Sequence, residues 1–394
     1  MSGPLAGVRV VEYAQYVAGP LCGVLLADLG ADVVKVEPPA GDGYRHVMPV
    51  APGVGRYFVP LNRGKRSVVV DLKSEGGRAT SARLLAAADV ALHNFPRDRA
   101  ERFGLSWDEL HAQYSRLVVG RVSSFGTTGP LAGAPAYDLV AQARAGLLTA
   151  HASRGDSVPV RAGGIPMADL TAGFLLATGV LAALVRARET GEGELVDVSL
   201  LAAAMAVQLQ DLVWLDGEGG DAARMADRAH LDARAAEIAG GVAMNPYYRC
   251  FEASDGFVAV ACLNVAQRRA LLDLFGLDDP TIDAPDLVPE DAEMLRVKQD
   301  LTASVERAFA ADTVDGWVAR LGFAGVPCGS VQQRETVHAD PQVVAERLVG
   351  TVDQPGLGAV RLLAPFIRAG GETPEATAAP TLGAHTDDVL AELA

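Results

Sequence analysis

The basic residues gathered between Leu61 and Gly104 are the first feature of this sequence that could carry chemistry. The stretch holds nine Lys/Arg and five Asp/Glu, so its charge is 9 − 5 = +4, whereas the whole chain has 34 basic and 49 acidic residues and a net charge of −15. The basic residues are Arg63, Lys65, Arg66, Lys73, Arg78, Arg83, Arg97, Arg99 and Arg102. Two interpretations stay open: an electropositive cleft for a phosphorylated ligand, or solvated helix faces and strand ends.

The motifs of several other chemistries are missing from the sequence. No G-x-G-x-x-G follows the first apolar run, and Gly64-Lys65 lacks the upstream glycine and the following Ser/Thr of a P-loop. Neither a G-x-S-x-G nucleophile nor an H-E-x-x-H zinc motif occurs. Cys22, Cys250, Cys262 and Cys328 are too widely spaced to suggest a zinc site or a disulfide framework. We therefore expect neither a metal nor a nicotinamide or ATP site.

Composition narrows the class of protein further. The acidic surplus argues against a nucleic-acid-binding protein, and 49% apolar residues can fill more than one core. The longest mostly apolar stretch, 174–185, has 12 residues, fewer than the ~20 that cross a bilayer, so a buried helix is the better interpretation. Cysteine usage and the N-terminal residues, which do not read as a signal peptide, predict a cytoplasmic protein.

Alternating strand-like and helix-like segments must position whatever site the chain carries. β-Branched runs predict strands at 8–13, 32–37, 67–72, 89–94, 117–123 and 194–200. Between them, 76–88 is an Ala-rich helix and 170–187 a long buried one. Because strands that alternate with helices form parallel sheets with both faces covered, the sequence predicts an α/β, Rossmann-like large domain.

A change in amino-acid composition divides the chain into domains. Residues 216–245 are charged and Gly-rich, which is typical of a crossing between domains. The predicted organisation is 1–215 as the N-terminal part of a large domain, 216–245 as a linker, 246–325 as a small α/β domain, and 326–394 as a return linker and the C-terminal part of the large domain. In the small domain we expect a strand at 257–262 and helices at 266–275 and 297–321. A further helix is expected to start at 382–386.

A series of short segments, in order along nearly the whole chain, resembles the class III CoA-transferase family, the group of carnitine CoA-transferase and formyl-CoA transferase. The matching segments are Leu5-x-Gly7-Val8-Arg9-Val10, Ala18-Gly19-Pro20, LADLGADVVKVE at 26–37, NRGKRS at 62–67, Asp71-Leu72-Lys73, His93-Asn94-Phe95, Gly126-x-x-Gly129-Pro130, Asp169, VDVSL at 196–200 and LGAHTDDVL at 382–390. The resemblance implies an acyl-CoA and a carboxylic acid as substrates, with no permanently bound cofactor. Family members form interlocked homodimers, so the same is expected here.

The resemblance assigns the catalytic role to Asp169. A carboxylate attacks the thioester of an acyl-CoA to give a mixed anhydride, and CoA returns through an aspartyl thioester. The alternative is that Asp169 caps the apolar helix that follows it, since Asp is a favoured N-cap. Both roles are compatible, because a helix N-terminus stabilises a carboxylate and offers backbone N–H groups to a developing oxyanion.

The family's CoA contacts map onto residues of the N-terminal half. They are Ala18, Leu72, Lys73, Asn94, Phe95 and Arg102. A basic residue commonly follows Asn-Phe in the family, whereas this chain has Pro96 there and Arg97 next. Arg97 is therefore a candidate substitute. Tyr137-Asp138 matches the Tyr-acidic pair of the transferases, with ordinary packing at a strand end as the alternative.

Two other functions remain as alternatives. The first is an α-methylacyl-CoA racemase, which shares the fold and the aspartate but pairs the aspartate with a histidine. The position of that histidine is Tyr137 in this chain. A phenol, with a pKa of about 10, is a poor proton shuttle, so racemisation is disfavoured. A non-catalytic CoA-binding subunit of a hetero-oligomeric transferase would not need Asp169. Oxalate is not the expected acid, because Val17 and Pro38 stand where the oxalate-type members have Gln and Arg.

Overall fold

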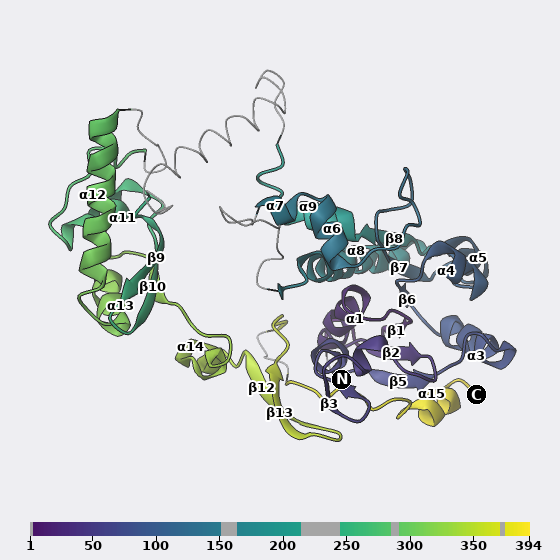
Figure 1. Cartoon of the computed structure of the whole chain (residues 1–394). Coiled ribbons are helices and arrows are strands. Elements are labelled where there is room, and N and C mark those ends of the chain that lie inside the picture. Colours follow the sequence, from purple (N-terminus) through teal and green to yellow (C-terminus); the bar gives the residue numbers. More distant parts are fainter. Residues whose placement is uncertain (1–2, 151–163, 214–244, 285–290, 371–374) are drawn as a thin grey trace. The chain divides into compact units, whose positions relative to one another are not determined.

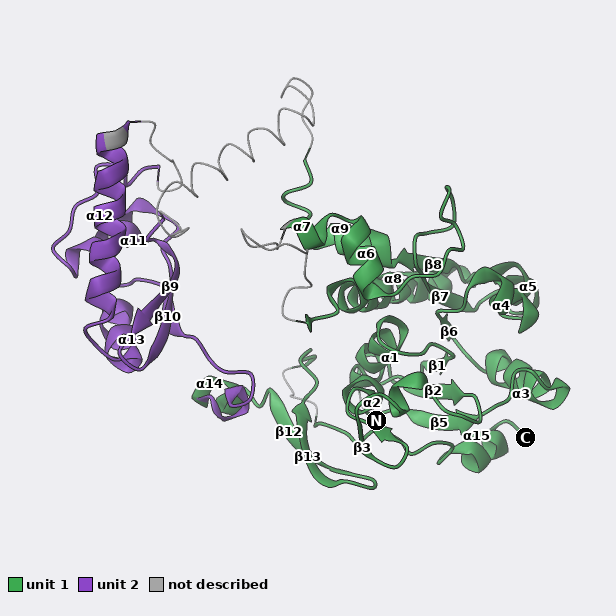
Figure 2. Cartoon of the chain, in the orientation of Figure 1, with its two compact units in different colours: residues 1–214, 341–394 green, residues 215–340 purple. Residues whose placement is uncertain are grey.

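The computed structural model describes residues 3–150, 164–213, 245–284, 291–370 and 375–394. The chain forms two compact units (Figure 2): unit 1 consists of residues 1–214 and 341–394, and unit 2 of residues 215–340. The predicted linker 216–245 lies outside the described residues except for Asn245.

Unit 1 is built on a six-stranded parallel sheet (Figure 1). Its strands, in spatial order, are β5 (Arg66–Val69), β2 (Asp32–Glu37), β1 (Arg9–Glu12), β6 (Val90–His93), β7 (Val118–Ser123) and β8 (Leu195–Ser199). The chain builds the sheet outward from β1 on one side and then returns to build the other side. This order is that of the Rossmann fold, so the predicted α/β parallel architecture is confirmed.

Helices cover both faces of the sheet because successive strand residues point to opposite faces. Val10 belongs to the buried cluster on one face and Val11 to the cluster on the other. The first cluster is completed by α1 (Ala18–Asp28), α6 (Asp138–Arg144), α8 (Met167–Thr190) and α9 (Leu200–Ala206). The second is completed by α3 (Glu75–Ala86), α4 (Arg97–Arg102), α5 (Trp107–Gln113) and α15 (Thr386–Glu392). The short α7 (Leu147–Ala150) follows α6.

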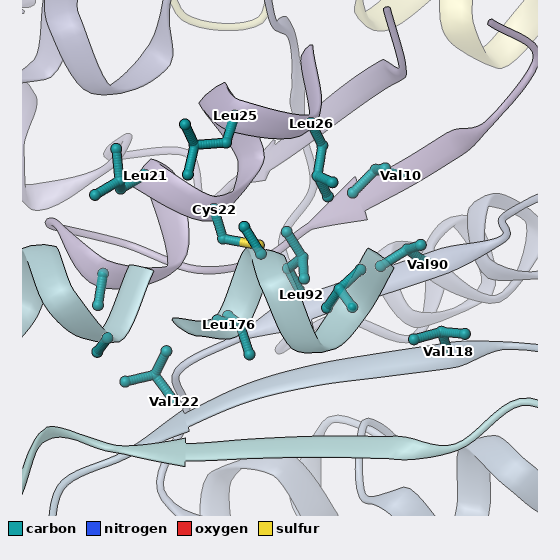
Figure 3. Close-up of a cluster of buried hydrophobic side chains, with 14 of the residues drawn as sticks. Val10, Leu21, Cys22, Leu25, Leu26, Val90, Leu92, Val118, Val122 and Leu176 are labelled. Atoms are coloured by element: carbon teal, nitrogen blue, oxygen red, sulfur yellow. The ribbon is translucent and has the colours of Figure 1, made fainter. Parts of the chain in front are cut away.

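The longest helix, α8, is buried in unit 1 along one face and exposed along the other, where Phe174 and Val185 lie. By length and composition alone it could cross a membrane. However, its Ala172, Leu176 and Val180 are each 0% exposed. Figure 3 shows Leu176 facing side chains of α1 and the sheet, among them Cys22 and Leu92. The helix predicted at 170–187 is confirmed, but its burial is limited to one face.

Smaller elements complete unit 1. They are η1 (Gly43–Arg45), β3 (Pro49–Ala51), β4 (Val54–Gly55), α2 (Phe58–Asn62), α14 (Pro341–Ala345), β12 (Val349–Gln354) and β13 (Gly358–Leu363). The β12–β13 hairpin comes from the C-terminal segment, and its Val352 and Leu362 share a small core with Phe58 and Val59 of α2. The sequence prediction did not include this hairpin.

Unit 2 has a three-stranded antiparallel sheet in the order β11–β10–β9. Its elements are β9 (Tyr248–Ala253), β10 (Gly256–Ala261), α11 (Val265–Asp273), α12 (Ala292–Phe309), α13 (Val314–Phe323), β11 (Cys328–Ser330) and η3 (Val337–Ala339). Phe251 of β9 stacks on Phe309 of α12 with ring centroids 4.3 Å apart. The strand predicted at 257–262 and the helix at 266–275 are confirmed.

One helix prediction in unit 2 is wrong. The range 297–321, expected to be a single helix, is divided between α12 and α13. The division occurs because Thr313 begins a new helix: its hydroxyl accepts the N–H of Gly316 at 3.2 Å. A side-chain oxygen that satisfies a free N–H of the first turn is the usual start of a helix.

Candidate active site

The strand order of the parallel sheet reverses between β1 and β6. The segment after β1 enters α1 on one face, whereas the segment after β6 enters α4 on the other face. Such a divergence marks the position at which α/β folds bind their ligands. Asn94 joins the two segments: its Nδ2 donates to the carbonyl of Gln15 at 2.8 Å, and its Oδ1 accepts the N–H of Gln15 at 3.1 Å.

A cavity of about 390 Å³ lies at the carboxyl ends of β6 and β7. Three of the expected CoA contacts, Asn94, Phe95 and Arg97, line it. Phe95 is held by Phe103, with ring centroids 5.6 Å apart in an edge-to-face arrangement. Trp107 and the loop 123–127 complete much of the wall. The cavity therefore presents aromatic side chains and the guanidinium group of Arg97 to a ligand.

The other expected CoA contacts lie outside that lining. Ala18 opens α1 and is 3% exposed, and Leu72 is 8% exposed, so both can offer little except backbone groups. Lys73 is exposed in the segment after β5. Arg102 is also exposed and lies 3.6 Å from Asp98 in a surface ion pair. Surface pairs of this kind are weak, so this guanidinium can be redirected to a ligand at small cost.

Three residues of the basic segment do not form an electropositive cleft, and for them that prediction is wrong. Arg63 pairs with Asp28 and is buried. Arg66 pairs with Asp32 at 2.5 Å and also with Glu392. The third residue is Lys65.

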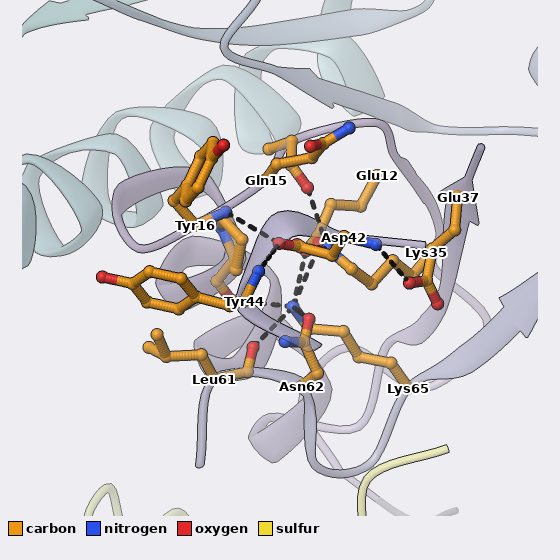
Figure 4. Close-up of polar contacts among 12 residues, drawn as sticks. Glu12, Gln15, Tyr16, Lys35, Glu37, Asp42, Tyr44, Leu61, Asn62 and Lys65 are labelled. Carbon is orange, nitrogen blue, oxygen red and sulfur yellow. Dashed lines mark hydrogen bonds and ion pairs between the residues drawn. The ribbon is translucent and has the colours of Figure 1, made fainter. Parts of the chain in front are cut away.

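Lys65 lies inside unit 1. Its ammonium donates to both carboxylate oxygens of Glu12, at 2.9 and 2.8 Å, and its side chain is 0% exposed (Figure 4). A Cβ at Gly23 would lie only 1.8 Å from Glu12 Oε2, so glycine is needed there for α1 to pass this ion pair. Lys65 therefore neutralises the buried carboxylate of Glu12 and has a structural role. For Arg63 and Lys65, the alternative of solvated surface positions is equally wrong.

Asp169 is the third residue of α8 and is half-buried in the first turn of that helix. The N-cap position belongs to Pro166, which has no capping side chain. Asp138, the first residue of α6, performs that function from outside the helix: its Oδ1 accepts the N–H groups of Ala168 at 2.9 Å and Asp169 at 3.2 Å. The alternative in which Asp169 caps its own helix is therefore wrong.

The remaining N–H groups of this turn also have acceptors. Met167 N–H donates to the Ile165 carbonyl at 3.0 Å, and Leu170 N–H to the Pro166 carbonyl at 2.9 Å. The expectation that the first turn of α8 supplies donors to an oxyanion is not met in this arrangement. The helix dipole still favours negative charge at both Asp138 and Asp169.

The close approach of α8 to α1 places Asp169 near the start of α1. Gly173 lies four residues after Asp169, hence on the same face of the helix. A Cβ at Gly173 would lie 2.8 Å from the Ala18 carbonyl oxygen and 2.8 Å from a methyl of Leu21. The missing side chain therefore lets the first turn of α1 and the nucleophile candidate share one edge of the sheet.

Three tyrosine rings, each from a different segment of unit 1, form a chain of contacts. The ring of Tyr16 is edge-on to that of Tyr44 at 5.4 Å and to that of Tyr137 at 6.0 Å, and Tyr137 directly precedes Asp138. Burial, and next the negative charge of Asp169, raise the pKa of Tyr44. Burial, and next the neighbouring Tyr137, raise the pKa of Tyr16. Both phenols are therefore protonated at neutral pH.

Sequence reasoning missed Tyr16 and Tyr44, as well as Asp42, which binds the backbone of both. No motif in the sequence marks the two tyrosines. The turn Gly41-Asp42-Gly43 is a signal that could have identified Asp42, because Asp between glycines commonly accepts the N–H two residues on. Among the described residues, no group of three or more His, Cys, Asp or Glu side chains could hold a metal ion.

Comparison with known proteins gives a consistent result along the whole chain. The model of CoA-transferase family III matches residues 5–386. Succinate–glutarate CoA-transferase of Agrobacterium fabrum is 32% identical over 99% of this chain and 96% of its own length. Acetyl-CoA:oxalate CoA-transferase of Acetobacter aceti is 32% identical over 90% and 88%. The crystal structure of a CAIB/BAIF family protein from Brucella suis superimposes with a TM-score of 0.77 at 29% identity, covering 100% of both chains.

Proposed function

Since this chain belongs to CoA-transferase family III and is a CoA-transferase, we propose that it moves CoA from an acyl-CoA to a carboxylic acid through covalent intermediates on Asp169. The observation that carries the proposal is that Asp138, and not Asp169, caps the start of α8. Asp138 accepts the N–H groups there, so the Asp169 carboxylate is not needed as a cap. A half-buried carboxylate in the first turn of a helix suits a nucleophile.

The proposed reaction conserves the thioester. An oxygen of the Asp169 carboxylate attacks the thioester carbonyl carbon, the C–S bond breaks, and CoA leaves as a thiolate. The thiolate then attacks the aspartyl carbonyl of the mixed anhydride, which releases the donor acid and leaves CoA as a thioester on Asp169. The acceptor carboxylate attacks this thioester, forming a new anhydride, and the released thiolate takes the acceptor acyl group. Asp169 is regenerated without any other co-reactant.

The oxyanion formed at each step needs a hydrogen-bond donor. Because the first-turn N–H groups of α8 are occupied, the phenol of Tyr44 is the donor we assign to this role. Burial, and next the negative charge of Asp169, raise the pKa of Tyr44, so its phenol stays protonated. A neutral donor beside a developing negative charge lowers the barrier in a site with little water.

CoA binding is proposed for the cavity at the carboxyl ends of β6 and β7. Asn94 and Phe95 offer an amide and an aromatic face, and Arg97 a guanidinium with an 82% exposed side chain. Lys73 follows β5 at the same edge of the sheet, since the carboxyl ends of parallel strands share one edge. Together with Arg102, these cations can neutralise the phosphates of the nucleotide.

For the acids, the relatives define the first substrates to be tried. Their names include succinate, glutarate and oxalate, so we propose short dicarboxylic acids as the substrate class. Succinyl-CoA with glutarate and acetyl-CoA with oxalate are the starting pairs, and transfer is followed by mass spectrometry of the CoA esters. The prediction against oxalate from Val17 and Pro38 is tested in the same screen.

Asp169→Asn is the variant that tests the chemistry. It keeps the shape of the side chain and removes the nucleophile, so CoA transfer should be lost while CoA binding is retained. Full turnover by this variant would contradict the proposal. A racemase would instead incorporate deuterium from solvent at the α-carbon of the acyl group. A non-catalytic subunit would bind CoA and transfer it to no acid in the screen.

We further propose that two copies of the chain interlock, each passing through a ring formed by the other. Support comes from the family, together with the course of the chain, which leaves unit 1 after residue 214 and returns to it at residue 341. Such an excursion provides the segment around which a partner copy could close.

A further inference from the structure

Asp42 is a fully buried carboxylate that the proposed chemistry does not use. It lies between β2 and η1 and is 0% exposed. Figure 4 shows it among Tyr16, Tyr44 and Lys35, which come from three separate segments. Burying a carboxylate costs free energy unless hydrogen bonds and an opposite charge compensate it.

The two oxygens of Asp42 have different partners. Oδ1 accepts the backbone N–H of Tyr44 at 2.9 Å and that of Tyr16 at 3.3 Å. Oδ2 lies 2.9 Å from the ammonium of Lys35, which also donates to Glu12 Oε1 at 3.0 Å. The lysine therefore fixes the orientation of the carboxylate, and the carboxylate fixes the backbone of two tyrosines.

The backbone of Tyr16 needs such a restraint. Its φ is +70°, in the left-handed region that a bulky residue rarely adopts. Strain of this kind persists only where surrounding contacts enforce it, and it gathers at functional sites. A Cβ at Gly43 would lie 2.8–2.9 Å from the ring of Tyr16, so the segment after Asp42 also packs directly against that ring.

A chain of contacts connects the ring of Tyr16 to the backbone of Asp169. Tyr16 contacts Tyr44 and Tyr137 at 5.4 and 6.0 Å between centroids, and Tyr137 precedes the Asp138 that accepts the N–H of Asp169. We propose that Asp42 is a positioning residue which, through Tyr16 and Tyr44, holds an aromatic wall beside Asp169. This inference rests on the proposed role of Asp169. The wall orients the acyl group and limits the access of water to the anhydride, which water would otherwise hydrolyse.

Asp42→Asn tests the proposal. An amide presents either its NH₂ to Lys35 or its NH₂ to the two backbone N–H groups, so one set of contacts is lost in either orientation. We expect kcat to fall about 10- to 100-fold, as for a displaced active-site group, with the KM for acyl-CoA changed less than about twofold. The share of acyl-CoA hydrolysed rather than transferred should rise.

Asp28→Asn is the matched control. It removes the charge of another buried carboxylate of unit 1, which pairs with Arg63 and not with the backbone of a tyrosine. Its thermal stability should fall in the same way, whereas kcat and the hydrolysed share should stay at the wild-type values. A loss of kcat in Asp42→Asn no larger than that of the control would overturn the inference.

Gly43→Ala gives an independent test that leaves the ion pair intact and reaches the same ring. The added methyl meets the outer edge of the Tyr16 ring, which can move, so the variant should fold. Gly76→Ala, whose methyl would meet nothing within 4 Å, is its control. A lower kcat and a higher hydrolysed share in Gly43→Ala alone support the inference; wild-type values in both variants contradict it.

The same experiments separate this inference from the proposed function. Acyl transfer to Asp169 is followed in a single turnover with the wild type and with Asp42→Asn. No adduct in the wild type refutes the proposed function. An adduct that forms equally fast in both proteins refutes only the role of Asp42.

Discussion

Asp138 connects the stability of a helix to the position of the nucleophile. It accepts two N–H groups at the start of α8, one of them that of Asp169 itself. Asp138→Ala should lower the free energy of unfolding by about 1 kcal/mol, the usual value of a lost cap. It should also lower kcat, because the first turn of α8 is no longer held. Urea denaturation and steady-state kinetics measure the two effects.

Asp291 provides the control for this prediction. It caps α12 in unit 2 by accepting the N–H groups of Glu293 and Met294 at 3.1 and 2.9 Å. Asp291→Ala should therefore cost a similar free energy of unfolding without the same loss of kcat. Equal kinetic effects of the two substitutions would argue that Asp138 is only a cap.

His93 makes the stability of unit 1 depend on pH. Burial, and next the charge of Arg121, lower the pKa of His93 to about 3. In the unfolded chain the pKa of a histidine is about 6.5. Between about pH 3 and pH 6.5 the unfolded chain therefore binds more protons than the folded protein. The free energy of unfolding therefore decreases as pH falls through this window, by about 2 kcal/mol from pH 7 to pH 5 for this single group.

Replacing His93 by a side chain that does not titrate should remove that contribution. Urea denaturation of the wild type and of His93→Asn at pH 7 and pH 5 compares the two pH dependences, whatever the variant's absolute stability. The decrease from pH 7 to pH 5 should be smaller in His93→Asn by about 2 kcal/mol. Equal decreases would show that His93 is protonated in the folded protein.

Individual residues show what sequence reasoning can and cannot reach. Asp169 was found through its resemblance to a family, and position alone left it open between nucleophile and cap. Lys65 was misjudged because its partner Glu12 lies on a strand far away in sequence, and no spacing rule joins them. For Asp42, the local turn accounts only for the contact with Tyr44; its other contacts come from segments that no spacing rule joins.

Among the elements, the crossing of α1 and α8 controls the geometry of the site. Gly173→Ala places a methyl against the Ala18 carbonyl and Leu21, so the helices must separate. We expect a loss of about 1 to 3 kcal/mol in the free energy of unfolding, as for overpacked cores, together with a lower kcat. Denaturation and kinetics on the same preparation measure both quantities.

Gly322→Ala in α13 is the control for that helix crossing. A methyl there would meet nothing within 4 Å, and Ala is the better helix former. This variant should be as stable as the wild type or more stable. If Gly173→Ala behaves in the same way, the close approach of α1 and α8 does not limit the fold.

The central parallel strands are predictable because they are β-branched runs buried on both faces, as 32–37 illustrates, whereas the edge strand β8 is only partly buried. By contrast, the β12–β13 hairpin was missed: its exposed residues, such as Leu363, and its polar residues, such as Asp353, do not alternate clearly. The helix prediction at 297–321 joined two helices because the apolar spacing continues past Phe309. Only the capping by Thr313 separates them.

At the scale of the whole molecule, the proposed interlocked dimer makes a prediction about dissociation. The protein should elute near twice 41.0 kDa and should not release monomer on dilution, because interlocked chains separate only by unfolding. Size-exclusion chromatography over a wide concentration range, with circular dichroism of each fraction, tests this. A monomer that appears on dilution and keeps its native spectrum would rule out interlocking.

The central claim is that Asp169 carries the CoA or acyl group during turnover, and mass spectrometry of the trapped intermediate tests it most directly. The protein is incubated with acyl-CoA without an acceptor acid, quenched, digested with trypsin and searched for an adduct on the 162–186 peptide, which contains Asp169. The account predicts an acyl or CoA adduct on this peptide that is removed by hydroxylamine and absent from Asp169→Asn. An enzyme that transfers CoA while no adduct forms, or that carries the adduct on another peptide, would contradict it.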